Sequence, residues 1–290
     1  MPETFLCELF YPSFFADFLI ALIGAILGIG GAYLIYRVSI RQIRIDRLKY
    51  VVSLIESFVL SAKRQSEFCT QHYQAILLHP FANSELKLDA NRDIKRLSDK
   101  MDQEGVYHAY LWKYKREDKS YDEFKNLYGY IDYLDFLIDD LISTNLRIIE
   151  FMWQRKKQYQ VSFKKLKELI QQLSLDEHLN KEQPEFVNFS INTLKTFLDK
   201  EHEHENLVES YKSVVDPLRN FIAQKVETHL KVTEIYLQLD DLVGQYFSIE
   251  LQAKHNAEDY KMYAAALMEK GNELENASQP LRDDFALKVK

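Results

Sequence analysis

Residues 18–36 form a run of nineteen residues without a charged side chain, FLIALIGAILGIGGAYLIY. Across residues 14–36 the only carboxylate or basic group is Asp17, near the start of the segment. A helix of about 20 apolar residues matches the hydrocarbon thickness of a bilayer. The sequence therefore predicts a transmembrane helix over residues 14–36. The alternative is a core helix buried inside a water-soluble protein.

The charges that flank this segment are distributed asymmetrically. Acidic residues precede it, and a series of basic residues follows it: Arg37, Arg41, Arg44, Arg47 and Lys49. A secretory signal peptide has the opposite order, and an excess of basic residues marks the cytoplasmic side of a span. We therefore expect an extracytoplasmic tail at 1–13 and an inner (cytoplasmic) membrane location, with all residues from 37 onward in the cytoplasm. The guanidinium groups of Arg37, Arg41 and Arg44 are expected to contact the headgroups of anionic membrane lipids.

Small residues are concentrated in the apolar segment, which holds four of the eight glycines of the chain. Small residues let helix backbones approach closely in lipid, and β-branched residues at seven-residue spacing are typical of a coiled-coil seam in water. Both occur here in one register, which predicts a homo-oligomer and a pore-lining face. That face comprises Asp17, Ala21, Gly24, Gly28, Gly31, Val38, Ile45 and Val52. The alternative is a helix that packs against its own domain, and Asp17 either lines a water-filled path or reaches headgroup water.

The rest of the chain contains few helix-breaking residues and no alternating pattern typical of strands, so the fold class is predicted to be all-α. A juxtamembrane stalk helix is expected over 37–78, ending before Pro80, and a helical cytoplasmic domain over 79–290. This part of the chain is expected to form one helical domain, and the alternative is two lobes that are parted near Pro184. Helices are expected at 85–103, 106–116, from Ser120 to Leu173, from Ser174, from Asp216–Pro217 to about residue 252, and from Asn256 to Gly271.

No phosphate-binding glycine loop, nucleophile elbow or zinc-protease motif occurs in the sequence. We expect no enzymatic activity, no cofactor and no metal site. Two acidic clusters are candidate metal ligands, EHEHE at 201–205 and the set Asp132, Asp135 and Asp139. Because neither has an evident second ligand segment, solvated helix surface is the preferred interpretation of both.

Aromatic and basic residues interleave in two segments, YHAYLWKYKR at 107–116 and WQRKKQYQVSFKKLK at 153–167. Rings and cations together are suited to stacking on bases and pairing with phosphates, so a nucleotide or oligonucleotide ligand is one hypothesis. Packing of the rings in a core is the alternative. It is favoured by charge, because beyond residue 49 the chain has 32 basic and 40 acidic residues. The candidate ligand patch comprises Tyr107, Tyr110, Trp112, Lys113, Arg116, Arg155, Lys156 and Lys157.

The layout of a short outer tail, one span and an all-helical cytoplasmic part resembles the membrane-active effectors of bacterial antiphage defence. Some of these, such as the Hailong type, conduct ions and are controlled by a nucleotide product of a partner enzyme. The resemblance covers the layout alone and carries no functional residue over to this chain. It implies an oligomeric pore that is gated when the cytoplasmic domain senses a ligand or a regulatory cytosolic protein. The alternatives are a nonconducting membrane-anchored scaffold and a membrane-tethered binder of single-stranded nucleic acid.

Overall fold

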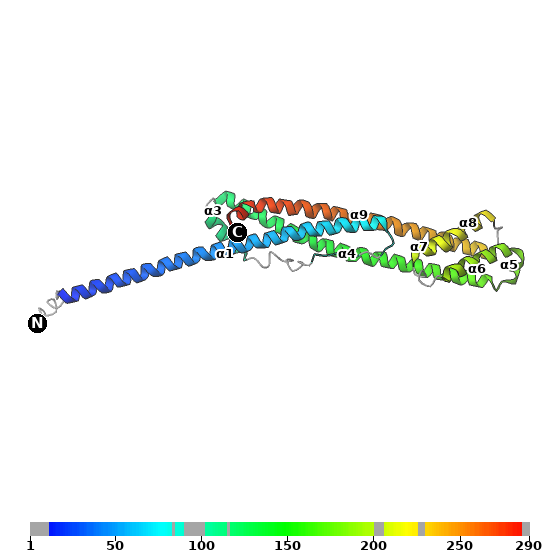
Figure 1. Ribbon diagram of the computed structural model, residues 1–290, viewed down its shortest axis with the longest axis horizontal. Coiled ribbons are helices and arrows are strands. Elements are labelled where there is room, and N and C mark those ends of the chain that lie inside the picture. The colour runs from blue at the N-terminus through cyan, green and yellow to red at the C-terminus, as the bar shows by residue number, and fades with distance from the viewer. Residues whose placement is uncertain are drawn as a thin grey trace. The chain divides into compact units, whose positions relative to one another are not determined.

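The computed structural model describes residues 12–82, 85–89, 102–114, 117–199, 206–225 and 230–285. Of these residues 93 % are helical and none is in a strand, which confirms the all-α prediction (Figure 1). The helices are α1 (Pro12–Leu78), α3 (Gln103–Tyr114), α4 (Glu117–Leu173), α5 (Glu177–Glu182), α6 (Pro184–Leu198), α7 (Leu207–Ser210), the π-helix η3 (Tyr211–Val215), α8 (Asp216–Lys225) and α9 (Leu230–Phe285).

Two helix ends agree with the sequence prediction. Helix α1 ends at Leu78, before Pro80, and α4 ends at Leu173. The start of α4 differs from the prediction: it begins at Glu117, and Ser120 is buried inside the helix instead of capping it. Ser120 lies in the first turn of α4, where its side chain is packed in the protein interior.

Several predicted breaks are absent because packing favours a continuous helix. Helix α9 runs through Asn256, where a helix start was predicted, and through Gly271, where a helix end was predicted. A glycine in a helix costs about 1 kcal/mol relative to alanine. Gly271 lies in a packed environment, however, since a Cβ built there would lie 3.6 Å from Ala62 Cβ. Such packing outweighs the intrinsic preference of the residue.

An α-helix does begin at Asp216, as predicted, but it continues directly from a π-helix without an N-cap and ends at Lys225, not near residue 252. Helices α7, η3 and α8 follow one another without a break, so Pro217 lies inside a helical run. The N–H of Asp216 donates to the carbonyl oxygen of Tyr211, five residues earlier, which is the π-helical pattern. The predicted helix at 85–103 is wrong where it is described, because residues 85–89 are not helical, and residues 90–101 lie outside the described ranges.

The chain forms two compact units, and neither is a continuous stretch of sequence. Unit 1 comprises residues 1–59, 94–132 and 273–290, and unit 2 comprises residues 60–93 and 133–272. The division does not fall near Pro184, the position that the sequence offers as a boundary between two lobes. Pro184 instead occupies the first turn of α6, where its missing N–H costs no hydrogen bond.

Unit 1 packs the middle of α1 with α3, the start of α4 and the end of α9. Its buried side chains include Leu48, Val51, Val52, Ile55 and Phe58 of α1, Val106 and Tyr110 of α3, Leu127 and Ile131 of α4, and Leu274 and Leu281 of α9. Polar contacts at its periphery join the same helices. Arg282 of α9 pairs with Glu56 of α1 at 3.2 Å, and Tyr114 of α3 donates to Asp284 at 3.1 Å.

Unit 2 has a hydrophobic core formed by α4, α5, α6, α7, η3, α8 and α9. Aromatic rings are prominent in it: Tyr159 and Phe163 of α4 stack at 6.3 Å, and Phe163 meets Phe197 of α6 edge to face at 5.6 Å. Leu166 and Ile170 continue this buried face of α4 and are fully buried. The amphipathic period of α4 thus has its physical cause in this core.

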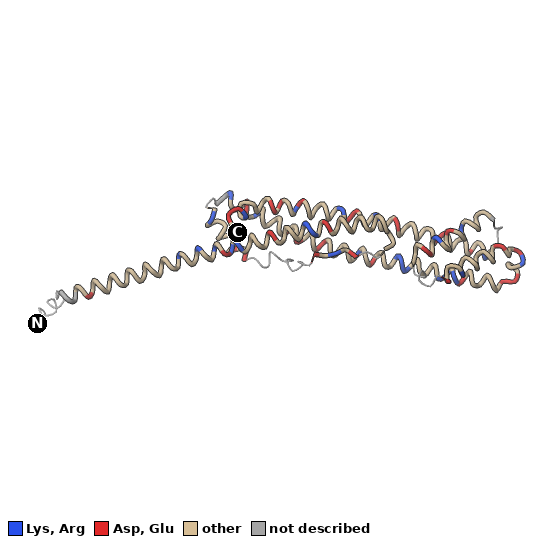
Figure 2. Tube along the Cα trace, in the orientation of Figure 1, with Lys and Arg blue, Asp and Glu red and all other residues tan. Residues whose placement is uncertain are grey.

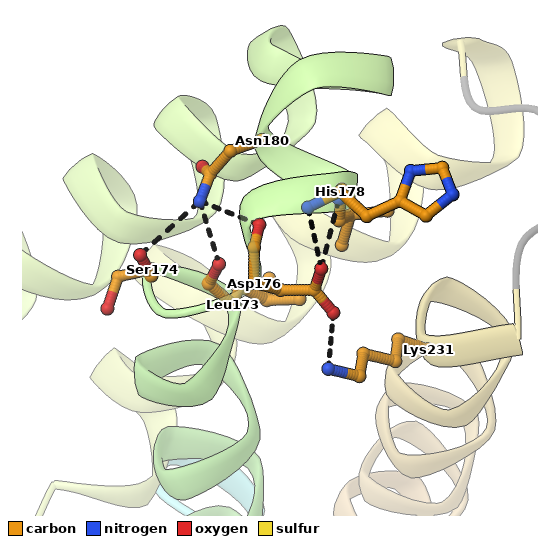
Figure 3. A network of polar contacts seen from close by, with 7 residues as sticks. Leu173, Ser174, Asp176, His178, Asn180 and Lys231 are labelled. Atoms are coloured by element: carbon orange, nitrogen blue, oxygen red, sulfur yellow. Dashed lines mark hydrogen bonds and ion pairs between the residues drawn. The ribbon is translucent and has the colours of Figure 1, made fainter.

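A polar network fixes the turn from α4 to α5 (Figure 3). Asp176 is the N-cap of α5, where its carboxylate accepts from the backbone N–H groups of His178 and Leu179, each at 3.1 Å. Lys231 at the start of α9 also donates to this carboxylate. The amide of Asn180 donates to three carbonyl oxygens around the turn, among them that of Asp176 at 2.9 Å. The predicted cap Ser174 instead donates to the carbonyl oxygen of Gln171.

The unit 2 core yields a first prediction. Leu166→Ala should lower the free energy of unfolding by about 2–5 kcal/mol, because it removes a fully buried side chain and leaves a cavity. Val161→Ala on the same helix is the matched control, since Val161 is 62 % exposed, and should change it by less than about 0.5 kcal/mol. Denaturant unfolding in dodecyl maltoside, followed by circular dichroism, measures both. Equal effects would contradict the assignment of this core.

The Asp176 network yields a second prediction. Hydrogen bonds from Lys231 and then from the backbone N–H of Leu179 lower the pKa of Asp176 to about 2 from its ordinary 3.8. Because the folded pKa is depressed, this carboxylate stabilises the fold above pH 4, and the contribution is lost as the pH falls towards 2. Asp176→Asn keeps a capping side chain. Its deficit in stability relative to the native chain should therefore be present at pH 6 and vanish near pH 2, whereas a deficit independent of pH would contradict the ion pair.

Candidate functional site

The N-terminal part of α1 is apolar and is not covered by any described part of the chain. Its large apolar side chains from Phe15 to Tyr36 range in exposed fraction from 40 % for Leu19 to 72 % for Ile29. Figure 2 shows this end of the helix almost without charged residues. Among the described residues, α1 is the one helix long and apolar enough to cross a membrane, and that stretch is not buried at all. A core helix of a water-soluble protein would be covered.

The energetic consequence of this exposure is large. Burial of one such side chain contributes about 1.5–3 kcal/mol relative to leaving it in water. Summed over the segment, contact with water would cost on the order of 20–40 kcal/mol, more than the whole stability of a typical domain. The segment therefore requires another apolar environment. The helix continues without interruption from this segment to Leu78, so the apolar end and the packed region belong to one continuous helix.

Glycines on the exposed segment leave open space beside the backbone. A Cβ atom built at Gly24, Gly28, Gly30 or Gly31 would meet nothing within 4 Å. No described part of the chain therefore requires a glycine at these positions. Gly24, Gly28 and Gly31 lie with Asp17 and Ala21 on one side of the helix, whereas Gly30 lies on another side. We call Asp17, Ala21, Gly24, Gly28 and Gly31 the glycine face.

The structure divides the predicted oligomerisation and pore face into two parts. The glycine face and Val38 are uncovered, with Val38 66 % exposed, and Ile45 is half-buried. Val52 is only 3 % exposed and Leu48 is fully buried within unit 1. Val52 is therefore unavailable for contact with a second chain, which corrects the prediction. Of the β-branched positions below the apolar segment, Val52 thus serves the chain's own packing, whereas Val38 does not.

The three arginines predicted to contact lipid lie at the junction between the apolar segment and unit 1. The guanidinium of Arg37 lies 5.9 Å from the ring centroid of Tyr33, and Arg41 is exposed. The guanidinium of Arg44 lies 5.7 Å from the ring centroid of Trp112 on α3. Arg44 and Trp112, predicted for separate roles, thus form one cation–π contact.

The α3 half of the candidate ligand patch is occupied largely by packing within unit 1. Tyr110 is buried and donates to Glu123 at 3.2 Å, and burial together with this carboxylate raises the pKa of Tyr110. The half-buried ring of Tyr107 packs against Phe124 at 5.2 Å. Lys113 pairs with Asp284 at 3.4 Å. Arg116 lies outside the described residues. These rings therefore follow the core-packing alternative.

The α4 half of the patch is split between two recesses in unit 2. Arg155 lines a recess of about 240 Å³ that also contains Asp241 and Gln245. Lys156 and Lys157 line a larger cavity of about 560 Å³. The seven patch residues that the structure describes thus belong to different places in the fold, and two of them line the larger cavity.

The larger cavity contains residues that sequence reasoning did not identify. Its described lining includes His72 and Ile76 of α1 together with Ala253, Asn256 and Tyr260 of α9. A signal exists in the spacings, since i, i+4 and i, i+3, i+7 place each set on one helix face. What a single sequence does not show is which faces meet.

In the described part of the chain, no group of three or more histidine, cysteine or acidic side chains is positioned to hold a metal ion. Residues 201–205 lie outside the described residues. Cys69 is buried, and burial raises its pKa to about 11, so its thiol is protonated at neutral pH.

Comparison with known proteins adds no relative to this geometry. No family model matches the chain, and neither the curated proteins nor the solved structures include a significant match.

Proposed function

We propose that this protein is an oligomeric single-pass membrane effector whose cytoplasmic helical units sense a ligand or partner and gate a pore formed by the membrane helices. The observation that carries the proposal is the uncovered apolar end of α1, continuous with a helix whose later residues are fully buried in a folded core. Lipid supplies the apolar environment that this end lacks. A role in bacterial antiphage defence is proposed from the resemblance in layout.

The orientation follows from charge. Arginine and lysine residues follow the span and acidic residues precede it, so the N-terminus is placed outside and the helical units in the cytoplasm of the inner membrane. Arg37 and Arg41 then lie at the cytoplasmic headgroups.

Self-association is proposed to occur through the glycine face. In lipid the hydrophobic effect does not bring helices together, and close backbone approach through small residues does. Positions with open space beside the backbone permit that approach. Because Val52 and Leu48 are buried in unit 1, the association is confined to the membrane segment and the residues just below it. This confinement favours an assembly in which spans meet while the cytoplasmic units remain individually folded.

A third prediction tests the glycine face. Gly28→Leu should weaken self-association about ten- to a hundredfold, because overpacking a close contact costs about 1–3 kcal/mol. Gly30→Leu is a matched control: it adds the same side chain to the same segment but on a different side of the helix, so association should be retained. Neither leucine meets a steric clash with its own chain at the Cβ position. Single-molecule photobleaching in liposomes measures subunit number. Equal loss or equal retention in the two variants would contradict the assignment.

A fourth prediction separates a pore from a nonconducting anchor. The purified protein in planar bilayers, alone or with extract of phage-infected cells, should carry cation-selective current, because Asp17 shares the glycine face. Asp17→Asn should lower the cation-to-anion permeability ratio about fivefold, the effect of roughly 1 kcal/mol from one charge at close range in water. Asp46→Asn, outside the span, is the control and should leave this ratio unchanged. An oligomer that passes no current under either condition would leave the anchor as the function.

A further inference from the structure

The cavity in unit 2 has an apolar interior and a basic opening. Ile76, Ala253 and Tyr260 are each less than one-tenth exposed and form its interior, with Ile148 and Met152 of α4 beside them. Trp153 is 60 % exposed and Lys157 is exposed, so these two side chains lie where the cavity meets water. The volume of about 560 Å³ is within the range of sites for small organic molecules.

Two lysines give the opening its charge. Lys157 Nζ lies 4.9 Å from the ring centroid of Trp153, and this cation–π contact holds the ammonium group beside the cavity. Lys156 Nζ donates to the carbonyl oxygen of Phe81 at 2.8 Å, which ties the segment after α1 to α4. Burial lowers the pKa of Lys156, and an anion placed beside it would offset that effect. Among the described residues of the lining, Glu85 is the one acidic side chain.

The cavity also contains a buried polar group without a partner in the described structure. Asn256 is 7 % exposed, its Oδ1 accepts from Gln252 at 2.9 Å, and its Nδ2 has no hydrogen-bond partner. An unpaired buried amide N–H carries a desolvation cost that a ligand acceptor would remove. Tyr260, by contrast, is already satisfied, since its hydroxyl donates to Asn145 at 2.8 Å and its ring meets His72 edge to face at 4.5 Å.

We propose that this cavity binds an organic anion, with the apolar body of the ligand against Ile76, Met152 and Ala253, its charge at Lys156 and Lys157, and an acceptor atom at Asn256 Nδ2. An apolar interior excludes a bare inorganic anion, and a basic opening disfavours a neutral hydrocarbon. The assignment of this cavity as the sensing site rests on the proposed function, whereas anion binding in the cavity does not require the pore.

The test uses the two tryptophans of the chain. Trp112→Phe leaves Trp153 as the sole tryptophan, so fluorescence of the full-length protein in dodecyl maltoside reports locally on the cavity opening. The probes are AMP, an anion with an aromatic body, and octanoate, an anion with an aliphatic one. We expect a saturable change in Trp153 emission with at least one of the two probes. The probe that binds shows whether the cavity accepts an aromatic or an aliphatic apolar group. Calorimetry on the native chain provides the affinity and does not depend on the Trp112→Phe variant.

Matched charge reversals on α4 locate the binding. Lys157→Glu should weaken binding at least about tenfold, since it replaces an attractive charge with a repulsive one at the opening. Lys164→Glu makes the same change at an exposed position outside the described lining and should leave affinity unchanged. Both lysines are exposed, so neither variant disturbs a core. Asn256→Leu should weaken binding as well, by removal of the buried donor.

Two results would overturn the inference: neither anion binds, or Lys157→Glu and Lys164→Glu bind equally well. These failures are distinguishable from failure of the proposed function. An anion that binds in this cavity to a protein that never conducts contradicts the pore alone. A conducting protein that binds neither probe contradicts the cavity site alone.

Discussion

The structure depends on one property of the α-helix, which is that it satisfies its backbone hydrogen bonds internally. A single helix can therefore pass from an apolar environment into a folded, water-exposed protein without a break, and only its side chains need to change. Helix α1 makes that change between Tyr36 and Leu48, where exposed apolar residues give way to arginines and then to fully buried positions. The buried positions of α1 form part of the core of unit 1. The exposed apolar positions are the basis of the proposed membrane role.

Much of the fold could be predicted from the sequence, and the reasons are local. Helix ends at Leu78 and Leu173 follow from nearby breaking residues or from the loss of an apolar period. The failures have a common cause, because Gly271, Pro217 and Ser120 all carry signals for a helix end and all lie within helical runs. Tertiary packing overrides intrinsic preferences, about 1 kcal/mol for glycine and about 3 kcal/mol for proline inside a helix, and a single sequence does not show where that packing occurs.

The seven-residue pattern of α1 shows the same limit in a functional setting. Glycines at 24 and 31 and valines at 38 and 52 share one register, and that register alone does not distinguish contact with a second chain from contact within the same chain. The structure separates the two cases at Ile45, since Val38 is exposed and Val52 is buried. In the same way, the sequence identified Lys156 and Lys157 as chemically interesting but not His72 or Asn256, which reach the same cavity from distant helices.

Helix α1 also connects the proposed ligand cavity with the proposed contact between membrane helices. A ligand shifts a conformational equilibrium only to the extent that it binds two states with different affinity. The cavity meets this condition if its wall moves, and part of that wall, His72 and Ile76, belongs to the helix that carries the glycine face. Helix α1 is continuous over its 67 residues, which include both the glycine face and this part of the cavity wall. In the proposed assembly, rotation by a fraction of a turn would exchange a glycine for a bulkier neighbour at the contact between spans. Because small-residue contacts tolerate no added side chain, such a rotation would give the proposed gate two discrete outcomes, closely packed and separated.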